Sequence, residues 1–242
     1  MANPQKIKAK LKHIQSHGSG VYSLFFSVPK KYTRFKPGQF THLTLEDFDS
    51  TLGFWPESRV FSIASEPKTE ELRIVYSVKG LYTSRMENEL AVNNEYWLKF
   101  PYGSFTIEDS IGDDQNIVLI AGGTGISPFI PYLLDKVKKQ PDRIVKLYYG
   151  VQKVEYLLFK DEMDQASALL PNFTAHVYTE EQCDLNDVCI GRLDIDRIYS
   201  ESNELNSPAF FLSGPPQMIS IFKNKLIAYG VQTGDIHIDE WE

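Results

Sequence analysis

The sequence predicts a β plus α/β protein, with a six-stranded antiparallel β-barrel followed by an α/β domain that has a parallel five-stranded sheet. Residues 1–100 consist mainly of short runs rich in β-branched and aromatic residues, which is typical of strands. Beyond residue 110, apolar strand-like runs alternate with helical ones. A polar segment at 106–116 separates the two patterns, so we expect domains at 1–110 and 111–242.

The bulk composition is that of an ordinary globular protein. A chain of 242 residues is long enough for two domains of about 100–150 residues, and 42% of it is hydrophobic. Neither a membrane-length apolar run nor an apolar signal core is present, so we expect a cytoplasmic protein. Two cysteines, Cys183 and Cys189, are too few for a disulfide framework or a four-cysteine metal site, and the scattered histidines predict no metal site.

The net charge of −7 is unevenly distributed. Residues 1–100 contain 14 Lys/Arg against 10 Asp/Glu, whereas residues 101–242 contain 11 against 22. Lys6, Lys8, Lys10 and Lys12 alternate, so they would share one face of a strand. This charge distribution either reflects ordinary solvated surfaces or gives the first half a basic surface for an acidic partner. It argues against nucleic acid as the main ligand.

The first domain is predicted to hold six strands and one short helix at residues 83–90. Along residues 72–78 the even positions are apolar, as one buried face of a strand requires. Short strands separated by Pro, Gly, Asp and Asn indicate a small barrel. The predicted strands are residues 6–14, 21–28, 38–46, 58–65, 71–78 and 95–100.

The second domain is predicted to alternate strands with helices. The uniformly apolar strands indicate a sheet that is buried on both faces and is therefore parallel, as in a Rossmann-like fold. The strands are residues 116–123, 143–150, 173–180, 209–214 and 235–241. The helical segments are residues 127–139, 155–167, 191–200 and 215–230.

A glycine turn joins the first predicted parallel strand to the first helix of the second domain. Gly123, Thr124 and Gly125 leave the backbone bare, so their amides could approach a pyrophosphate. We expect Ser127 to cap the helix and Pro128 to occupy its first position. Taken alone, the segment fits a dinucleotide site and a plain tight corner equally well.

A second bare turn favours the dinucleotide site. Ser213, Gly214 and Pro215 follow another apolar strand, and Met218 lies in the helix after them. Ligands of open α/β sheets bind at the carboxyl ends of the strands, where both turns would lie. Two such turns could hold one dinucleotide between them.

Several motifs, in order along nearly the whole chain, resemble those of the ferredoxin–NADP reductase superfamily. The resembling segments are FKPGQF (35–40), RVFS (59–62), GLYT (80–83), PYGSF (101–105), GTGISP (123–128), SGPP (213–216) and HIDEW (237–241). The resemblance implies a FAD-binding barrel at 1–110 and an NAD(P)-binding domain at 111–242. In this family a Pro is the expected sixth residue of the nucleotide motif, as in GTGISP. We expect no iron–sulfur domain in this chain.

The resemblance further implies roles for individual residues. Arg59 would hold a flavin phosphate, Ser62 would hydrogen-bond the flavin near N5, and Gly80 and Thr83 would bind the pyrophosphate. The other implied flavin-binding residues are Val60, Phe61, Val78, Ser84 and Trp241. The implied nucleotide-binding residues are Gly123, Thr124, Gly125, Pro128, Glu180, Gly214, Pro215 and Met218. The implied catalytic residues are Ser62, Ser213 and Glu240.

Some of these residues could have a purely structural role instead, and three positions depart from the family pattern. Arg59 could instead form a surface ion pair, and Glu240 could be an ordinary surface carboxylate. Trp241 could instead pack in the core. Phe61 replaces a Tyr, Ser213 replaces a Cys, and Trp241 is followed by one more residue. We expect the Phe61 and Ser213 changes to alter the rate rather than abolish function, and the residue after Trp241 makes this ending resemble bacterial members more than plant ones.

The implied activity is hydride transfer from NAD(P)H to bound FAD, with FMN as the alternative flavin. Electrons would then pass to an acidic ferredoxin- or flavodoxin-like carrier that docks on the basic barrel half. We expect the protein to be a monomer. The alternatives are a free-flavin reductase, the reductase component of an oxygenase, or a flavin-binding sensor without turnover. Glu180 and Glu181 would repel a 2′-phosphate while Lys153 could tolerate one, so NADH is favoured over NADPH.

Overall fold

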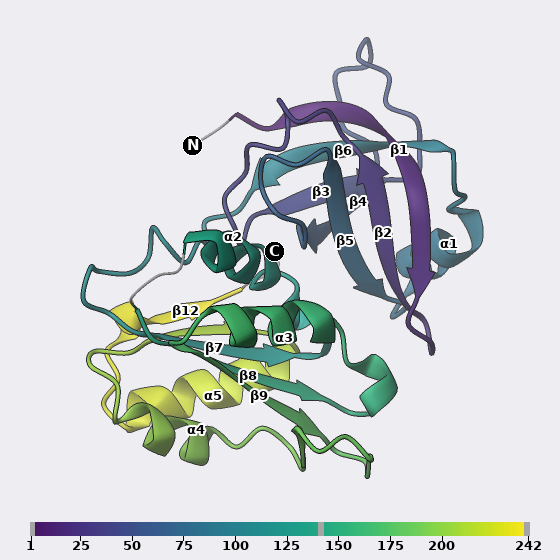
Figure 1. The fold of residues 1–242 in the computed structure, drawn as a ribbon. Coiled ribbons are helices and arrows are strands. Elements are labelled where there is room, and N and C mark those ends of the chain that lie inside the picture. Colours follow the sequence, from purple (N-terminus) through teal and green to yellow (C-terminus); the bar gives the residue numbers. More distant parts are fainter. Residues whose placement is uncertain (1–2, 140–142, 240–242) are drawn as a thin grey trace. The chain divides into compact units, whose positions relative to one another are not determined.

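A computed structural model describes residues 3–139 and 143–239 of the chain. The chain divides into two compact units, Met1–Thr106 and Ile107–Glu242, which we call unit 1 and unit 2. Figure 1 labels their helices and strands.

Unit 1 is a six-stranded antiparallel barrel, as the sequence predicts. Its sheet order is β4-β3-β6-β1-β2-β5, and a bridge between Ile63 and Ile74 joins the two end strands. Closing the sheet on itself leaves few unpaired strand edges. Its elements are β1 (Gln5–Ser16), β2 (Val21–Ser27), β3 (Phe40–Thr44), β4 (Ser58–Ser62), β5 (Glu71–Ser77), α1 (Leu81–Glu89) and β6 (Glu95–Tyr102).

Strand β1 separates the barrel core from a basic outer face. Ile7, Ala9 and Leu11 are buried, and the four lysines between and beside them lie on the other face, as their alternation predicts. Lys6 and Lys8 are exposed; Lys8 Nζ lies 2.9 Å from Asp47 Oδ1. These lysines therefore lie on the outer surface of unit 1.

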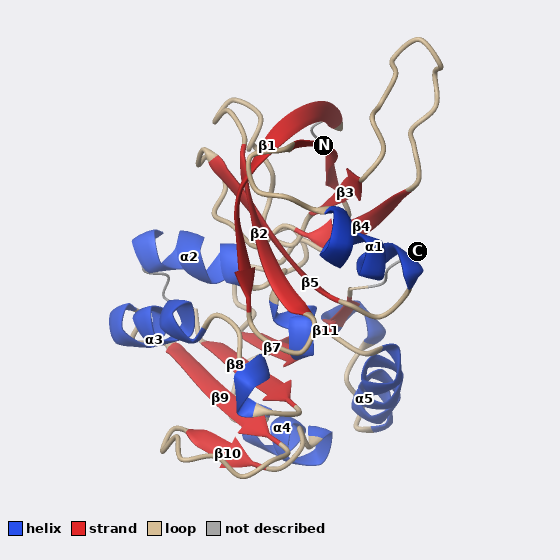
Figure 2. Ribbon diagram, turned by 90° about the vertical axis from the view of Figure 1, so that its right-hand side faces the viewer, coloured by secondary structure: helices blue, strands red, loops and turns tan. Residues whose placement is uncertain are grey.

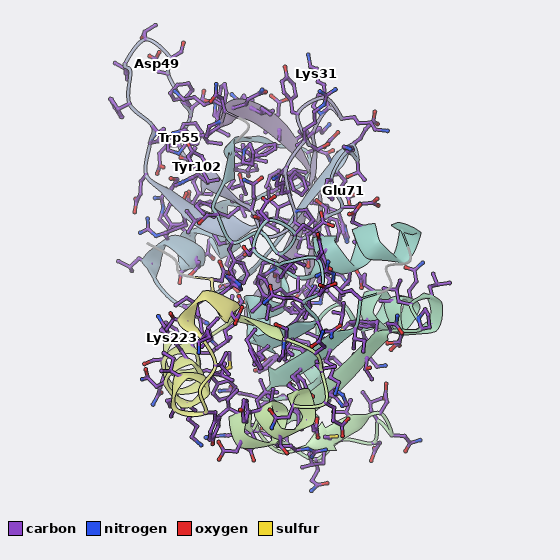
Figure 3. All side chains as sticks on the ribbon, turned by 90° about the vertical axis from the view of Figure 1, so that its left-hand side faces the viewer. Lys31, Asp49, Trp55, Glu71, Tyr102 and Lys223 are labelled. Atoms are coloured by element: carbon purple, nitrogen blue, oxygen red, sulfur yellow. The ribbon has the colours of Figure 1, made fainter. Side chains whose placement is uncertain are left out.

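The loop at 45–57, between β3 and β4, extends from the barrel. Figure 3 shows Asp49 near its tip, and Trp55 where the chain returns towards β4. The Trp97 Nε1–H donates to Asp47 Oδ1 across 2.6 Å, which ties the start of the loop to β6. Farther along, Leu52 and Phe54 are 62% and 63% exposed, so the tip presents apolar side chains to solvent.

Two of the motif segments pack against each other inside unit 1. Gly38 has φ +96°, and a Cβ there would lie 1.8 Å from the carbonyl oxygen of Phe105. Gln39 Nε2 also donates to the carbonyl oxygen of Gly103 across 3.2 Å. Glycine is required at Gly38 because both its conformation and its spacing leave no room for a side chain.

Unit 2 contains a six-stranded parallel sheet of order β10-β9-β8-β7-β11-β12. The strands are β7 (Ile117–Gly122), β8 (Val145–Val151), β9 (Phe173–Thr179), β10 (Val188–Ile190), β11 (Ala209–Ser213) and β12 (Ile236–Ile238). The five predicted strands are confirmed, but the predicted number is one too low. Strand β10 escaped prediction because it has three residues, two of them exposed, at the edge of the sheet.

Helices cover both faces of this sheet. Figure 1 shows α2 (Ile130–Lys139) and α3 (Lys160–Leu169) on one face, and α4 (Ile195–Ser202) and α5 (Pro216–Ala228) on the other. Figure 2 shows the same elements turned by 90°. Every residue of β7 and β11 is buried, which confirms the prediction of a parallel sheet enclosed by helices.

The glycine turn after β7 forms the 3₁₀ helix η1 (Gly123–Ile126). Ser127 continues this helical path with φ −54°, and its N–H donates to the carbonyl of Thr124; α2 begins at Ile130. The predictions that Ser127 caps the helix and that Pro128 is its first residue are therefore wrong. The glycines themselves start the winding, so the capping position moves back to Gly122.

Candidate functional site

The two bare turns of unit 2 are in direct contact. A Cβ on Gly125 would lie 2.5 Å from the carbonyl carbon and oxygen of Ser213 and 2.6 Å from Cα of Gly214. A Cβ on Gly122 would lie 2.7 Å from Cδ of Pro215 and 3.0 Å from Sδ of Met218. Two segments about 90 residues apart thus meet at the carboxyl ends of β7 and β11, and their close approach requires glycine.

The other side of the η1 turn is open. Gly123 has φ +55°, and nothing lies within 4 Å of the position a Cβ would take. The first N–H groups of a helix have no partner within it, and η1 has no acidic residue in its first turn. Thr124 and Gly125 are only partly buried. This cradle of amides fits a pyrophosphate.

A buried pair of polar side chains lies at the ends of β11 and β12. Ser213 is fully buried, and its Oγ donates to Asp239 Oδ2 across 3.0 Å. Asp239 is 5% exposed; burial raises the pKa of its carboxyl to about 7, against the opposing effect of the Ser213 hydrogen bond. Below about pH 7 this carboxyl retains its proton.

Asp239 lies in the HIDEW segment, but the sequence assigned it no role of its own. The predicted carboxylate, Glu240, and the predicted aromatic, Trp241, lie outside the described residues. Leu212 pairs with Ile238 in the register of β11 and β12, so Ser213 and Asp239 are the next residues along each strand. Extending the strand pairing by one residue would have found this pair.

Two ion pairs follow the neighbouring strands β8 and β9. Glu180 Oε2 lies 2.8 Å from both Nε and Nη2 of Arg192. Glu181 Oε1 lies 3.1 Å from Lys153 Nζ, and this carboxylate raises the pKa of Lys153. The predicted residue Glu180 is therefore at the carboxyl edge of the sheet, with its charge neutralised by an arginine that the sequence did not indicate.

In unit 1, the structure brings Arg59 to the start of α1. The guanidinium carbon of Arg59 lies 4.7 Å from the centre of the Tyr82 ring. The Tyr82 hydroxyl donates to the carbonyl of Leu43 across 2.8 Å, and burial raises the pKa of Tyr82 to about 12. Arg59 also pairs with Glu57 at 3.0 Å, so the alternative of a surface ion pair is present in the same side chain.

The first turn of α1 has the features of an anion site. Thr83 Oγ1 accepts from the N–H groups of Lys79 and Gly80, and Ser84 N–H donates to the carbonyl of Gly80. The amides between Gly80 and Ser84 have no intrahelical partner, and no acidic residue lies in this turn. With Arg59 beside it, this helix end fits a phosphate group.

The remaining predicted flavin residues vary in accessibility. Phe61 is 9% exposed and packs edge-to-face on Tyr76, with 6.2 Å between ring centres. Ser62 is 5% exposed, whereas Val60 and Val78 are partly buried. The stacking of Phe61 on a flavin and the contact of Ser62 with N5 both stay predictions.

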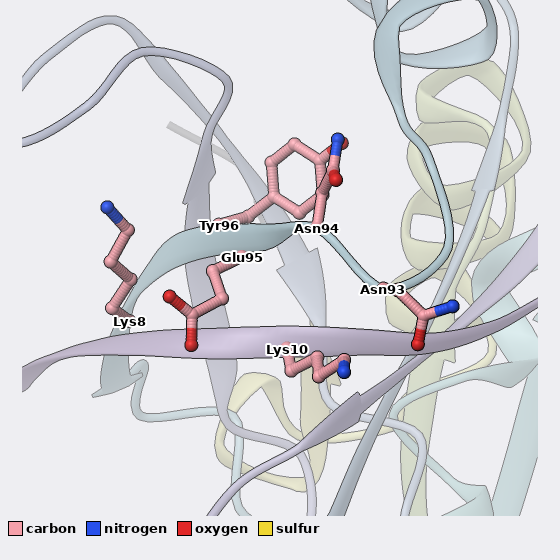
Figure 4. A pocket seen from close by; sticks show the side chains of 6 residues that line it. All are labelled: Lys8, Lys10, Asn93, Asn94, Glu95 and Tyr96. Atoms are coloured by element: carbon pink, nitrogen blue, oxygen red, sulfur yellow. The ribbon is translucent and has the colours of Figure 1, made fainter.

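An open depression on unit 1 is separate from all these residues. Its lining is mixed in charge, because Glu95 lies beside Lys8 and Lys10 (Figure 4). The other lining residues are Asn93, Asn94 and Tyr96.

Among the residues that the structure describes, no three His, Cys, Asp or Glu side chains are placed to hold a metal ion. No helix in the described ranges is long and apolar enough to span a bilayer.

The chain thus combines an antiparallel barrel with a parallel α/β unit in which two glycine turns meet at the carboxyl edge of the sheet. Residues 119–224 match the oxidoreductase NAD-binding domain family. The structure is similar to a ferredoxin NADP⁺ reductase from Neisseria gonorrhoeae with bound FAD and NADP. The TM-score is 0.79 at 21% identity, covering 99% of each chain. Residues 119–224 therefore carry the NAD-binding family signature, and the whole chain shares the fold of that ferredoxin NADP⁺ reductase.

Relatives in sequence include an oxygenase reductase component and a flavohemoprotein. The reductase component of propane 2-monooxygenase from Rhodococcus jostii (strain RHA1) is 27% identical, covering 98% of this chain and 64% of that protein. A flavohemoprotein from Rhizobium meliloti (strain 1021) is 26% identical, covering 85% of this chain and 52% of that protein. The chain thus spans between about half and two thirds of the length of these curated relatives.

Proposed function

We propose that the chain is a flavin-dependent oxidoreductase that transfers hydride from NAD(P)H to bound FAD and passes the electrons to a carrier protein. The observation that carries this proposal is the packing of Gly125 on Ser213 and Gly214, next to the open side of η1 where nothing lies within 4 Å of a Cβ on Gly123. The membership of residues 119–224 in an oxidoreductase NAD-binding family supports it.

In unit 2, the chain's own groups would bind and orient the nucleotide. The amides of Gly123, Thr124 and Gly125 would hold the pyrophosphate, with Pro215 and Met218 bounding the second turn. Ser213 and Asp239 would hold a proton at the buried carboxyl, because the pKa of Asp239 is about 7. Pro128 is buried behind η1, so its role would be to support the turn.

In unit 1, the flavin pyrophosphate would lie at the start of α1. Arg59 would supply a fork of charged donors, and the Thr83 hydroxyl would complete the helix-end site. Of the remaining implied residues, Ser62 would orient the flavin near N5 and Ser84 would support the first turn. The buried positions of Phe61 and Ser62 suit contact with the ring system rather than with its charged phosphates.

We infer that NADH is preferred over NADPH. The Glu180 carboxylate can accept hydrogen bonds from a free ribose diol but repels a 2′-phosphate. The test is the ratio of kcat/KM for NADH to that for NADPH, which we expect to exceed one. A ratio below one would reverse the inferred preference.

For the acceptor, we propose an acidic carrier such as a ferredoxin or flavodoxin, bound through the basic face of β1. The support is the row of lysines on the outer surface of unit 1. A second candidate is the reductase component of an oxygenase, which the similarity to the propane 2-monooxygenase reductase component favours. Measuring reduction of a ferredoxin, a flavodoxin, free FAD and an oxygenase component with one preparation would separate these acceptors.

The flavin itself is tested by releasing it. Purified protein is denatured, and the supernatant is analysed for FAD and FMN by chromatography. We expect FAD at about one per chain, after reconstitution if necessary. FMN alone, or no uptake of either flavin, would overturn the proposal for unit 1.

A further inference from the structure

The carboxyl ends of β8, β9 and β10 bring two acids and two bases together. Glu180 follows β9, and Arg192 lies two residues after β10, which pairs with β9. Glu181 and Lys153 form the second pair. At this edge of the sheet two cations are therefore present, and each is neutralised by a glutamate.

In the Glu180–Arg192 pair, only one of the two carboxylate oxygens contacts the guanidinium. Both Nε and Nη2 of Arg192 lie 2.8 Å from Oε2 of Glu180. Within the described part of the chain, Oε1 of Glu180 accepts no hydrogen bond. The pair thus fixes the carboxylate while leaving one oxygen to accept from a ribose hydroxyl.

The Arg192 side chain is 80% exposed, and that of Glu180 is 35% exposed. Arg192 is therefore not anchored by burial, and its position in this arrangement follows from its contact with Glu180. An exposed guanidinium whose carboxylate partner is removed can turn its donors to another anion. Phosphate accepts the same bidentate fork that a carboxylate does.

We propose that Arg192 can bind a 2′-phosphate but that its ion pair with Glu180 prevents this. This single ion pair would then set the selectivity for NADH over NADPH. The inference rests on the proposed nucleotide-binding function of unit 2. In the parent protein, a 2′-phosphate would have to approach the Glu180 carboxylate and break the pair. Without that carboxylate, Arg192 binds the 2′-phosphate directly.

The test uses binding rather than turnover. The full-length protein is titrated with 5′-AMP and with adenosine 2′,5′-bisphosphate by calorimetry, which requires no flavin chemistry. The variants are Glu180→Gln, Arg192→Gln and the double variant. Asp184→Asn is the matched control, because Asp184 is an exposed carboxylate four residues along the chain and forms no ion pair within residues 3–139 and 143–239.

We expect Glu180→Gln to bind adenosine 2′,5′-bisphosphate at least about tenfold more tightly than the parent, since a bidentate guanidinium–phosphate contact replaces a repulsion. The double variant returns close to the parent affinity, and Asp184→Asn stays within about threefold of it. In the holoenzyme, Glu180→Gln raises kcat/KM for NADPH by a similar factor.

Equal affinity of Glu180→Gln and the double variant for the bisphosphate would overturn the role of Arg192. If 5′-AMP still binds in that case, only this inference falls. If neither nucleotide binds any of the proteins, the proposed nucleotide site of unit 2 falls with it.

Discussion

Ser213 Oγ and Asp239 Oδ2 lie 3.0 Å apart, at the carboxyl ends of the adjacent parallel strands β11 and β12. Burial raises the pKa of Asp239 to about 7, and the hydrogen bond from Ser213 acts in the opposite direction. A carboxyl that changes charge near neutral pH is thus built into the edge of the sheet that carries the two glycine turns.

This pair predicts a pH dependence of stability. Between about pH 4 and pH 7 the folded protein keeps Asp239 protonated, whereas the unfolded chain ionises it. The folded state then binds more protons, so the free energy of unfolding falls as pH rises through this window. The loss attributable to Asp239 is at most about 4 kcal/mol, for a shift of roughly three pH units.

Urea unfolding at pH 5 and pH 8 measures this loss, with Asp239→Asn as the comparison. The variant keeps an oxygen for the Ser213 hydroxyl but cannot ionise, so its free energy of unfolding should fall less over the interval. As a second check, Ser213→Ala should raise the pKa of Asp239 further. Equal losses in the parent and Asp239→Asn would show that Asp239 does not titrate as described.

Gly125→Ala should separate the two turns of unit 2. Its Cβ would lie 2.5 Å from the backbone of Ser213, so we expect a loss of about 1–3 kcal/mol of unfolding free energy and weaker nucleotide binding. Gly234→Ala is the control, because a Cβ there meets nothing within 4 Å. Calorimetry with 5′-AMP and urea unfolding measure both effects. Parent-like behaviour of Gly125→Ala would refute the close contact.

Arg59→Ala should reduce flavin affinity with little effect on folding. Half of the Arg59 side chain is exposed, and charged hydrogen bonds to phosphate are worth about 1.5–3 kcal/mol. FAD binding, followed by fluorescence quenching, should therefore weaken by roughly tenfold to a hundredfold. Arg34→Ala, at another exposed arginine of unit 1, serves as the control. Unchanged affinity in Arg59→Ala would leave Arg59 as a surface ion pair.

The basic face of β1 should govern reduction of an acidic carrier. Replacing Lys10 and Lys12 by glutamate should slow ferredoxin reduction at low ionic strength and flatten its decline with added salt. Replacing Lys30 and Lys31, outside β1, makes the same charge change elsewhere on unit 1. Equal slowing by both double variants would point to net charge rather than to a docking face.

The fold was predictable because the spacing of apolar residues and the turn residues between them mark most strands and helices within short stretches of sequence. The alternation in β1 and the apolar runs of β7 and β11 each correspond to the burial that the structure shows. The three-residue strand β10 leaves no such pattern. The helix start was misplaced because Ser127 has the chemistry of a cap, while the glycines before it had already begun the winding.

The candidate site was predictable only where its residues lie in continuous motifs. The glycine turns and the RVFS segment are local in sequence, whereas Arg192 lies in no motif, and Asp239 lies in HIDEW but gains its partner only through strand pairing. Their chemistry depends on contacts across the sheet, namely the Glu180 carboxylate and the Ser213 hydroxyl. Single-sequence motifs do not contain these contacts.

The proposed function requires that a nicotinamide nucleotide reduces a flavin bound to this chain. The most direct test is an anaerobic titration of the purified, FAD-reconstituted protein with NADH, followed by its visible absorption. We expect a yellow protein whose absorption near 450 nm, roughly the band of oxidised flavins in general, bleaches with about one equivalent of NADH. A protein that retains FAD but stays yellow under excess NADH and excess NADPH would contradict it.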